Sequence, residues 1–185
     1  SNKKVWWLCK VRHSFESIFI QRNQGSKCPR CTHRTSMPEK RTYSELKYIF
    51  TSAIWQHKEN GIEIDVYLPH LKIGVEYDGV YFHKNKKTKD LEKNKKLKKI
   101  GIEIFRVREN GLDKLSDNDI ITKSGSVSKA DINNLLKKIK PTLNKELYFS
   151  VKKYISCKNY QNNDLFNQIE LQDIPFERSA LSSQK

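Results

Sequence analysis

The sequence predicts an α/β fold in which a mixed β-sheet is flanked by helices. Residues 62–68 and 73–77 alternate apolar and polar side chains on either side of Pro69-His70, which is the pattern of a β-hairpin. A lysine-rich stretch then leads to a second alternating run at 102–107. A strand that is reached through a helical crossover lies parallel to its neighbour, so the sheet combines antiparallel and parallel pairing.

Length and composition limit the protein to one moderate core and a small additional module. The chain has 185 residues, of which 36% are hydrophobic. Its 36 Lys and Arg residues outnumber its 21 Asp and Glu residues and give a formal net charge of +15, which favours a polyanionic partner. Nucleic acid is the main candidate, and an anionic membrane surface is the alternative, although the lysines form no basic amphipathic helix with a wide apolar face. No apolar run approaches the roughly 20 residues of a membrane span, and the N-terminus lacks a secretory apolar region. We therefore expect an intracellular, cytoplasmic protein associated with nucleic acid and with no membrane.

The first module, residues 1–36, contains two close pairs of metal-binding residue types. Three residues separate Cys9 from His13, and two residues separate Cys28 from Cys31. One imidazole and three thiolates suit a tetrahedral, structural Zn²⁺ ion. A disulfide is the alternative, but nothing in the sequence indicates an oxidising compartment.

The residues around these pairs resemble a family of zinc-ribbon domains. The resemblance is carried by Val5-Trp6-Trp7-Leu8-Cys9, by His13 and Phe15, and by Cys28-Pro29-Arg30-Cys31. The family usually has glycine where this chain has Arg12. Basic side chains make the module a predicted clamp on DNA phosphates, although exposed arginines often serve solubility alone. These nucleic-acid-binding candidates are Arg12, Arg22, Lys27, Arg30 and Arg34.

Residues 37–115 are expected to form the α/β core, which opens with a helix. After a polar linker, Thr42 or Ser44 can cap a helix that runs to about His57. Glu45 falls near the first turn, where the helix dipole alone also favours an acid. The apolar face of this helix takes Leu46, Ile49, Phe50, Ala53 and Ile54.

Three carboxylates are predicted to project from one face of the hairpin. With the loop centred on Pro69-His70, Asp65 lies opposite Gly74 and diagonal to Glu76, and Asp78 shares their face. Asp65 and Glu76 are then about 7–8 Å apart at the backbone, and Gly74 leaves space for a hard cation. A soluble hairpin can also simply keep its acids on a hydrated face, but clustered carboxylates repel one another unless a cation or protons neutralise them.

The run from Asp65 through Glu76-Tyr77-Asp78-Gly79 to His83 resembles the metal site of the PD-(D/E)XK restriction-endonuclease-like superfamily. It is most similar to the branch of the very-short-patch-repair endonuclease and its homing-endonuclease relatives. The resemblance covers residues 42–112 and implies hydrolysis of DNA phosphodiesters with Mg²⁺, for which Mn²⁺ can substitute. Asp65 and Glu76 are the implied metal ligands. Glu45, at the matching position of the preceding helix, is implied to fix the outer shell of the metal or to orient a catalytic residue.

One position departs from the family pattern. The usual motif ends in a lysine two residues after the glutamate, where this chain has Asp78. In the very-short-patch-repair branch, this position and the one five residues further on are histidines, so His83 matches the second. Lys93, on the following helix, can instead supply a displaced lysine. We rank His83 above Lys93 and expect Asp78 to be a further ligand or to shape the hydration of the metal.

The remaining residues extend this core. Residues 84–99 form a predicted lysine-rich helix that Gly101 ends, and its lysines either form a solvated face or border the path of a DNA backbone. Residues 116–159 are expected to be a flexible loop with accessory helices at 130–139 and 144–155. Residues 160–185 are a predicted polar tail.

The sequence therefore predicts a Mg²⁺-dependent DNA endonuclease whose zinc module assists DNA binding. One alternative is a catalytically inactive DNA-binding module, which Asp78 in place of lysine favours. Another is the cleavage subunit of a transposition or defence complex, whose protein partners choose the site. A homodimer and further domains of a longer chain are also compatible with the sequence.

Overall fold

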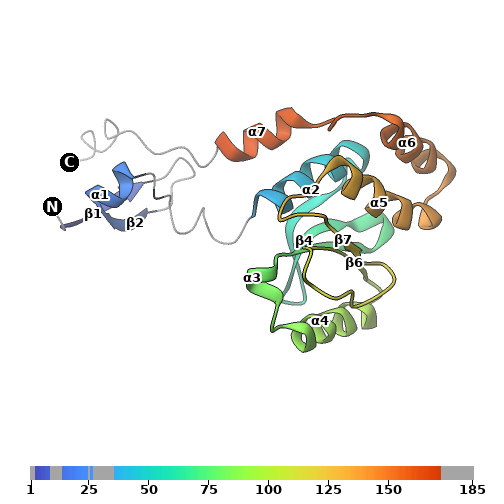
Figure 1. The fold of residues 1–185 in the computed structure, drawn as a ribbon, viewed down its shortest axis with the longest axis horizontal. Coiled ribbons are helices and arrows are strands. Elements are labelled where there is room, and N and C mark those ends of the chain that lie inside the picture. The colour runs from blue at the N-terminus through green and yellow to red at the C-terminus, as the bar shows by residue number, and fades with distance from the viewer. Residues whose placement is uncertain (1–2, 9–13, 25, 27–35, 172–185) are drawn as a thin grey trace. The chain divides into compact units, whose positions relative to one another are not determined.

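The computed structural model describes residues 3–8, 14–24, 26 and 36–171 (Figure 1). The chain divides into two compact units. The larger contains Ser36–Asn163, and the smaller contains the residues up to Thr35 and those from Asp164 onwards. The division falls close to the predicted boundary at residue 36, and it includes the expected accessory helices in the same unit as the α/β core.

In the smaller unit, strands β1 (Lys4–Leu8) and β2 (Ser14–Ile18) form an antiparallel pair, and the short helix α1 (Phe19–Asn23) follows directly. The Trp7 indole donates to the carbonyl of Ser17 at 3.0 Å and so ties the two strands together. Zinc binding by this module stays a prediction, because the four expected ligands lie outside the described residues. These are Cys9, His13, Cys28 and Cys31.

Five strands form the sheet of the larger unit, in the order β3-β4-β5-β6-β7. β3, β4 and β5 are antiparallel neighbours, whereas β5, β6 and β7 run parallel to one another. The predicted combination of an antiparallel hairpin with a parallel strand is confirmed. The strands are β3 (Ile54–Glu59), β4 (Ile62–Leu68), β5 (Ile73–Asp78), β6 (Glu103–Arg108) and β7 (Ile120–Ile121).

Helices cover both faces of this sheet, as predicted (Figure 1). On one face, apolar residues of α2, α5 and α6 share a core with Val66, Val75 and Phe105. On the other face, Leu97 of α4 packs with Ile104. The helices of this unit are α2 (Met37–Ile49), α3 (Val80–His83), α4 (Lys87–Lys99), α5 (Lys129–Ile139) and α6 (Lys145–Ser156). Helix α7 (Asn163–Leu171) belongs, apart from its first residue, to the smaller unit.

Helix α2 begins earlier than predicted. Its N-cap is Ser36, whose hydroxyl accepts a hydrogen bond from the Glu39 amide at 3.3 Å, and Pro38 lies in the first turn, where a missing N–H costs nothing. The stretch that was expected to be a polar linker is therefore the first turn of the helix. The shift places Glu39, and not Glu45, in that turn.

The expectation that this helix continues to His57 is wrong. The helix ends at Ile49, and His57 lies within strand β3. Asn60 and Gly61 have positive φ angles of 48° and 78° and make the tight turn between β3 and β4. A chain that turns back at this point pairs its preceding residues with β4, so they form a strand.

The hairpin of β4 and β5 has a longer loop than predicted. Leu68 pairs with Ile73, whereas the expected partner was Leu71. The cause is a single 3₁₀ turn at Pro69–Leu71, after which Lys72 adopts a left-handed conformation with φ 51°. The register changes by two residues, and because side chains alternate with a period of two, the faces are preserved.

The C-terminal helices belong to the core of the larger unit. α5 and α6 confirm the predicted helices, and a 3₁₀ turn at Lys140–Thr142 separates them at Pro141. Leu135 and Tyr154 are fully or almost fully buried against the sheet residues. The expected polar tail contains helix α7 before residue 172, where the described residues end.

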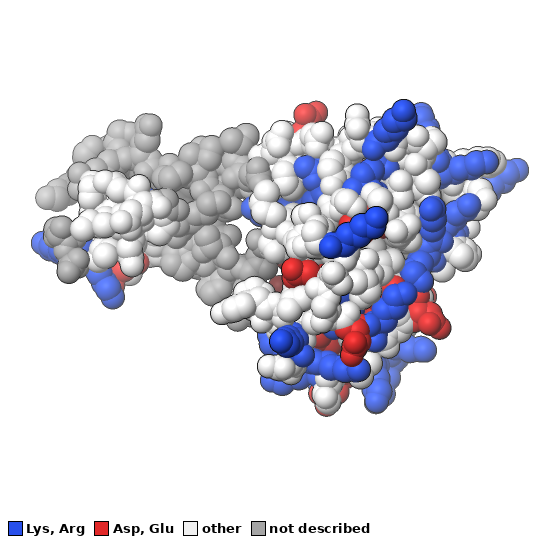
Figure 2. Space-filling model, in the orientation of Figure 1, with Lys and Arg blue, Asp and Glu red and all other residues white. Residues whose placement is uncertain are grey.

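Lysine and arginine side chains are spread over the visible face of the larger unit (Figure 2). Helix α4 and the residues before it contribute many of the exposed ones. Among the described residues, no helix combines the length and the apolar character that crossing a bilayer requires. The exposed lysines of this segment are Lys84, Lys86, Lys87, Lys89, Lys95, Lys96, Lys98 and Lys99.

Candidate active site

Three carboxylates from three different elements form what we call the acidic trio: Glu39 of α2, Asp65 of β4 and Glu76 of β5. Glu39 and Glu76 are buried, with 5% and 4% of their surfaces exposed. The backbone amide of Asp65 donates to Oε1 of Glu76 at 3.4 Å, and the amide of Tyr77 donates to Oδ2 of Asp65 at 2.8 Å. The trio therefore lies where α2 crosses the hairpin.

All three carboxylates are harder to ionise than ordinary acids. Burial raises the pKa of Glu39 from 4.5 to about 7. Burial and the nearby charges of Glu76 and Glu39 raise the pKa of Asp65 well above its usual range. Burial also raises the pKa of Glu76, although Lys93 and Arg106 act against the shift. A cluster of this kind gains stability from any cation that enters it.

Lys93 of α4 supplies one positive charge to the trio. Its ammonium lies 2.5 Å from Oε2 of Glu76, and the guanidinium of Arg106 lies at 4.0 Å from the same oxygen. Lys93, which the sequence offered as an alternative to His83, therefore contacts Glu76. Its charge also acts on Asp65, where it partly opposes the rise in pKa.

The donor set of the trio fits a hard divalent cation. Carboxylate oxygens are the ligands that Mg²⁺ and Mn²⁺ prefer, and three of them carry more negative charge than Lys93 compensates. The prediction that Gly74 leaves space for the cation is wrong. A Cβ at Gly74 would lie 2.5 Å from Ile104 Cδ1 and 2.9 Å from Ile64 Cγ2, so side chains already fill that space.

Two residues further along β5, Asp78 belongs to a second group, which we call the balanced cluster. Asp78 is fully buried and accepts hydrogen bonds from Arg106 at 2.7 and 3.0 Å and from Arg108 at 2.7 Å. Nδ1 of His83 lies 2.9 Å from Oδ2 of Asp90 and 3.4 Å from Oδ1 of Asp78. Two arginines offset two aspartates, so the cluster is close to neutral.

The balanced cluster also contains the one tight group of potential metal ligands among the described residues. Ligand atoms of Asp78, His83 and Asp90 lie within 4.8 Å of one another, closer than the acidic trio brings its own. Because Arg106 and Arg108 already hold these carboxylates, a cation here would meet two positive charges. The acidic trio therefore has the larger excess of acidic groups, and Asp78 is a structural anchor of the arginines.

Glu45, which the resemblance places in the site, lies elsewhere. Its carboxylate is fully buried and accepts from the Tyr154 hydroxyl at 2.6 Å and from the amides of Gln161 and Asn162 at 2.8 and 3.1 Å. These partners belong to the C-terminal part of the unit. Glu45 therefore anchors that segment, and Glu39 is the helix glutamate that faces Asp65.

Of the predicted DNA-binding residues, the described part of the chain includes Arg22. It is buried, and its guanidinium lies 5.2 and 5.3 Å from the ring centroids of Trp7 and Phe15. Its side chain also donates to the carbonyl of Ser26. Packing of this kind leaves little of Arg22 to meet a phosphate. The other four residues lie outside the described residues: Arg12, Lys27, Arg30 and Arg34.

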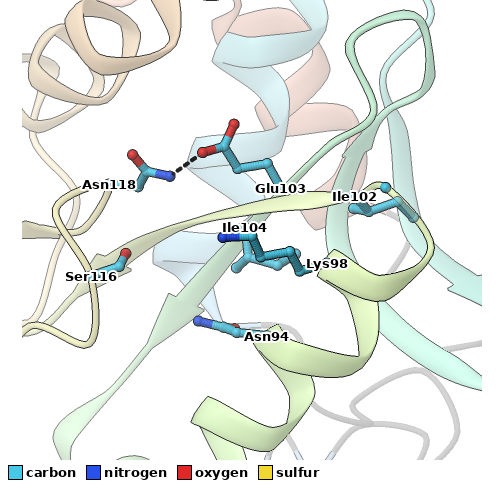
Figure 3. Close-up of a pocket in the computed structure, with 8 residues that line it drawn as sticks. Asn94, Lys98, Ile102, Glu103, Ile104, Ser116 and Asn118 are labelled. Carbon is cyan, nitrogen blue, oxygen red and sulfur yellow. Dashed lines mark hydrogen bonds between the residues drawn. The ribbon is translucent and has the colours of Figure 1, made fainter.

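A cavity of about 420 Å³ lies beside the start of β6, away from the trio (Figure 3). Lys98 and Asn94 of α4 line one side, and Asn118 on the opposite side donates to Glu103 at 2.7 Å. The carboxamide oxygen of Asn94 accepts from Arg106 at 2.7 Å. The cavity wall is thereby tied to the balanced cluster, and none of the trio lines it.

Comparisons of the chain with protein-family models, with curated proteins and with solved structures found no match. The residues of the site and their geometry are therefore the basis for a functional assignment.

Proposed function

We propose that this protein is a Mg²⁺-dependent DNA endonuclease with a restriction-endonuclease-like core. The observation that carries the proposal is the acidic trio with Lys93. Two buried carboxylates, Glu39 and Glu76, and the partly buried Asp65 all have raised pKa values, and one ammonium from α4 joins them. Structural ion pairs are usually balanced in charge, whereas this group has an excess of acid. The basic surface of α4 suits a polyanionic substrate inside the cell.

In this proposal Asp65 and Glu76 hold the cation and Glu39 completes its carboxylate shell. When bound, the cation offsets the charge that builds up on the scissile phosphate and makes a water acidic enough to attack at neutral pH. Lys93, which contacts Glu76 in the metal-free protein, would contact the same phosphate. The carboxylates orient the water, and the ammonium stabilises developing negative charge.

His83 is the proposed proton carrier. A neutral ring that donates through Nδ1–H to Asp90 keeps Nε2 as an acceptor. It can take a proton from the attacking water or return one to the leaving 3′ oxygen. Arg106, which contacts both Asp78 and Glu76, links His83's cluster to the trio.

The N-terminal module is proposed to bind structural Zn²⁺ through Cys9, His13, Cys28 and Cys31 and to assist DNA binding. The alternative function, a cleavage subunit whose protein partners choose the site, would use the same residues for cleavage. A catalytically inactive DNA-binding module is less consistent with the site, because Lys93 supplies the positive charge that Asp78 fails to supply.

The test is cleavage of supercoiled plasmid with Mg²⁺ or Mn²⁺, comparing the native chain with Asp65→Asn and with Glu63→Gln. Glu63 is an exposed acid on the same strand and serves as a matched control. We expect nicking or linearisation by the native chain and by Glu63→Gln, and a loss of at least about 100-fold in Asp65→Asn. DNA binding without cleavage by all three proteins, with both metals, would contradict autonomous nuclease activity.

A further inference from the structure

We infer that a left-handed bend at Gln56 opens the sheet for the cation, and that Gln56 and Trp55 are positioning residues for Glu39. The inference rests on the proposed function, since it concerns the cation that the acidic trio is proposed to bind. It adds two residues, neither of them a carboxylate, that come from β3, a strand with no part in the site predicted from the sequence.

The bend interrupts the pairing of β3 with β4 at one position. Trp55 pairs with Val66 and His57 pairs with Ile64, but the ladder passes over Gln56 and Asp65 between them. Gln56 has a φ of 50°, in a region that residues with a side chain rarely adopt and that a regular strand never uses. A strained conformation of this kind persists only where its surroundings hold it, and such positions cluster at functional sites.

The interruption falls at Asp65, one of the two proposed metal ligands. The ladder between β4 and β5 also stops short of Asp65, at Val66 and Val75. The amide of Asp65 turns to the Glu76 carboxylate, and its side chain accepts from the Tyr77 amide. On either side of Asp65, Ile64 and Val66 pack into different apolar clusters. The strand therefore twists at Asp65, and its carboxylate is held by backbone atoms.

The same bend directs two donors at Glu39. The Trp55 indole Nε1 donates to Oε1 of Glu39 at 3.0 Å, and Nε2 of Gln56 donates to the same oxygen at 3.4 Å. Trp55 is itself fixed by stacking on Tyr43, with centroids 5.4 Å apart and an angle of 14° between the rings. Both donors reach Oε1, so together they fix the orientation of the Glu39 carboxylate.

The residue type at position 56 follows from these two demands. Glycine would adopt the bend without strain but would lose the carboxamide, and a β-branched residue would favour extended backbone and restore the ladder. Glutamine accepts the strain and supplies the donor. If the role of Gln56 is purely structural, relieving the strain should raise the thermal stability and leave the Mn²⁺ affinity unchanged.

The experiment measures Mn²⁺ binding, from the electron paramagnetic resonance signal of free Mn²⁺, and thermal unfolding without metal. The variants are Gln56→Gly, Gln56→Val, Trp55→Phe and the control Lys58→Gln, an exposed residue of the same strand. We expect Gln56→Gly to melt at a higher temperature but to bind Mn²⁺ about threefold more weakly, and Lys58→Gln to match the native chain. Gln56→Val and Trp55→Phe are expected to bind about tenfold more weakly.

Native affinity in a folded Gln56→Val variant would overturn the inference. If that variant does not fold, native affinity in both Gln56→Gly and Trp55→Phe would overturn it. These results leave the proposed nuclease intact as long as Asp65→Asn abolishes Mn²⁺ binding. Mn²⁺ binding that is unchanged in Asp65→Asn would instead contradict the proposed metal site, and the inference would fail with it.

Discussion

Glu76 and Asp78 lie two residues apart on β5, on the same face of the sheet, yet their surroundings are opposite. Asp78 is held by Arg106 and Arg108, which bring as much positive charge as Asp78 and Asp90 bring negative charge. Glu76 lies near two other acids, contacts Lys93, and has Arg106 at the longer distance of 4.0 Å. Both carboxylates are buried, so exposure does not separate them.

The difference shows how burial of a charge can be read. A carboxylate that is buried with a full complement of arginines has a structural explanation, because separating it from them costs several kcal/mol. A carboxylate that is buried among other carboxylates lacks such an explanation and is neutralised by protons or by a cation, which makes it a candidate for a functional site. Charge balance, more than the identity of the acid, distinguishes the structural cluster from the candidate site.

The largest expected effect comes from breaking the balanced cluster. Asp78→Asn should lower the free energy of unfolding by about 3–5 kcal/mol, because two arginines remain buried without their main counter-charge. Urea unfolding followed by circular dichroism measures this. Asp113→Asn, which removes the exposed partner of Lys87, is the control and should change nothing measurable. An equal stability of both variants would contradict the assigned charge balance.

A smaller change in stability, which depends on pH, is expected from the acidic trio. The pKa of Glu39 is raised from 4.5 to about 7, so between these pH values the folded state holds a proton that the unfolded state has released. Stability of the metal-free protein is therefore greatest below this window and is lost as the pH rises through it, by about 1–3 kcal/mol. Urea unfolding in EDTA at pH 5 and pH 8 measures the loss. Glu39→Gln should reduce this loss, while Asp65 and Glu76 keep their own contributions. A native stability that does not change between pH 5 and pH 8 would contradict the raised pKa.

The smallest effect concerns Lys93. Its ammonium neutralises Glu76 in the metal-free protein and so competes with a cation. Lys93→Met should strengthen Mn²⁺ binding about threefold and yet lower plasmid cleavage. Lys95→Met, at an exposed position on the same helix, is the control for both measurements. Weaker Mn²⁺ binding in Lys93→Met would show that the lysine supports the metal site and does not compete with it.

The sequence predicted the sheet and the face that Asp65 shares with Glu76, because side chains in strands alternate with a period of two. That period also explains why the wrong register still kept Glu76 beside Asp65, since a two-residue shift does not change the face of a side chain. The twist at Asp65 was not predicted, and it places Ile64 and Val66 on opposite faces of the sheet, where strict alternation puts them on one. Glu39 was missed, although a signal was present. Ser36 and Glu39 have the spacing of a helix N-cap with its N3 residue, and Pro38 between them is typical of a first turn. The Asn60-Gly61 turn was a second missed signal.

Other features of the site had no local signal. Arg106 and Arg108 alternate with apolar residues as exposed side chains of a strand would, yet both are buried against Asp78, about thirty positions earlier in the chain. The contact of Lys93 with Glu76 depends on how α4 packs across the sheet. These pairings are set by tertiary packing, which a periodic pattern in one segment does not encode.

Glu45 has a consequence for how this protein can be divided or recombined. Glu39 of the candidate site lies on α2, and Glu45 follows almost two turns later on the same helix. The buried Glu45 carboxylate accepts hydrogen bonds from the amides of Gln161 and Asn162 and so holds α2 to that segment. A fragment that stops after the last sheet strand would leave this charge without its hydroxyl and amide donors, in the middle of α2. The smallest fragment that keeps the larger unit whole thus extends to Asn163, and any exchange of the C-terminal segment has to bring its own partner for Glu45.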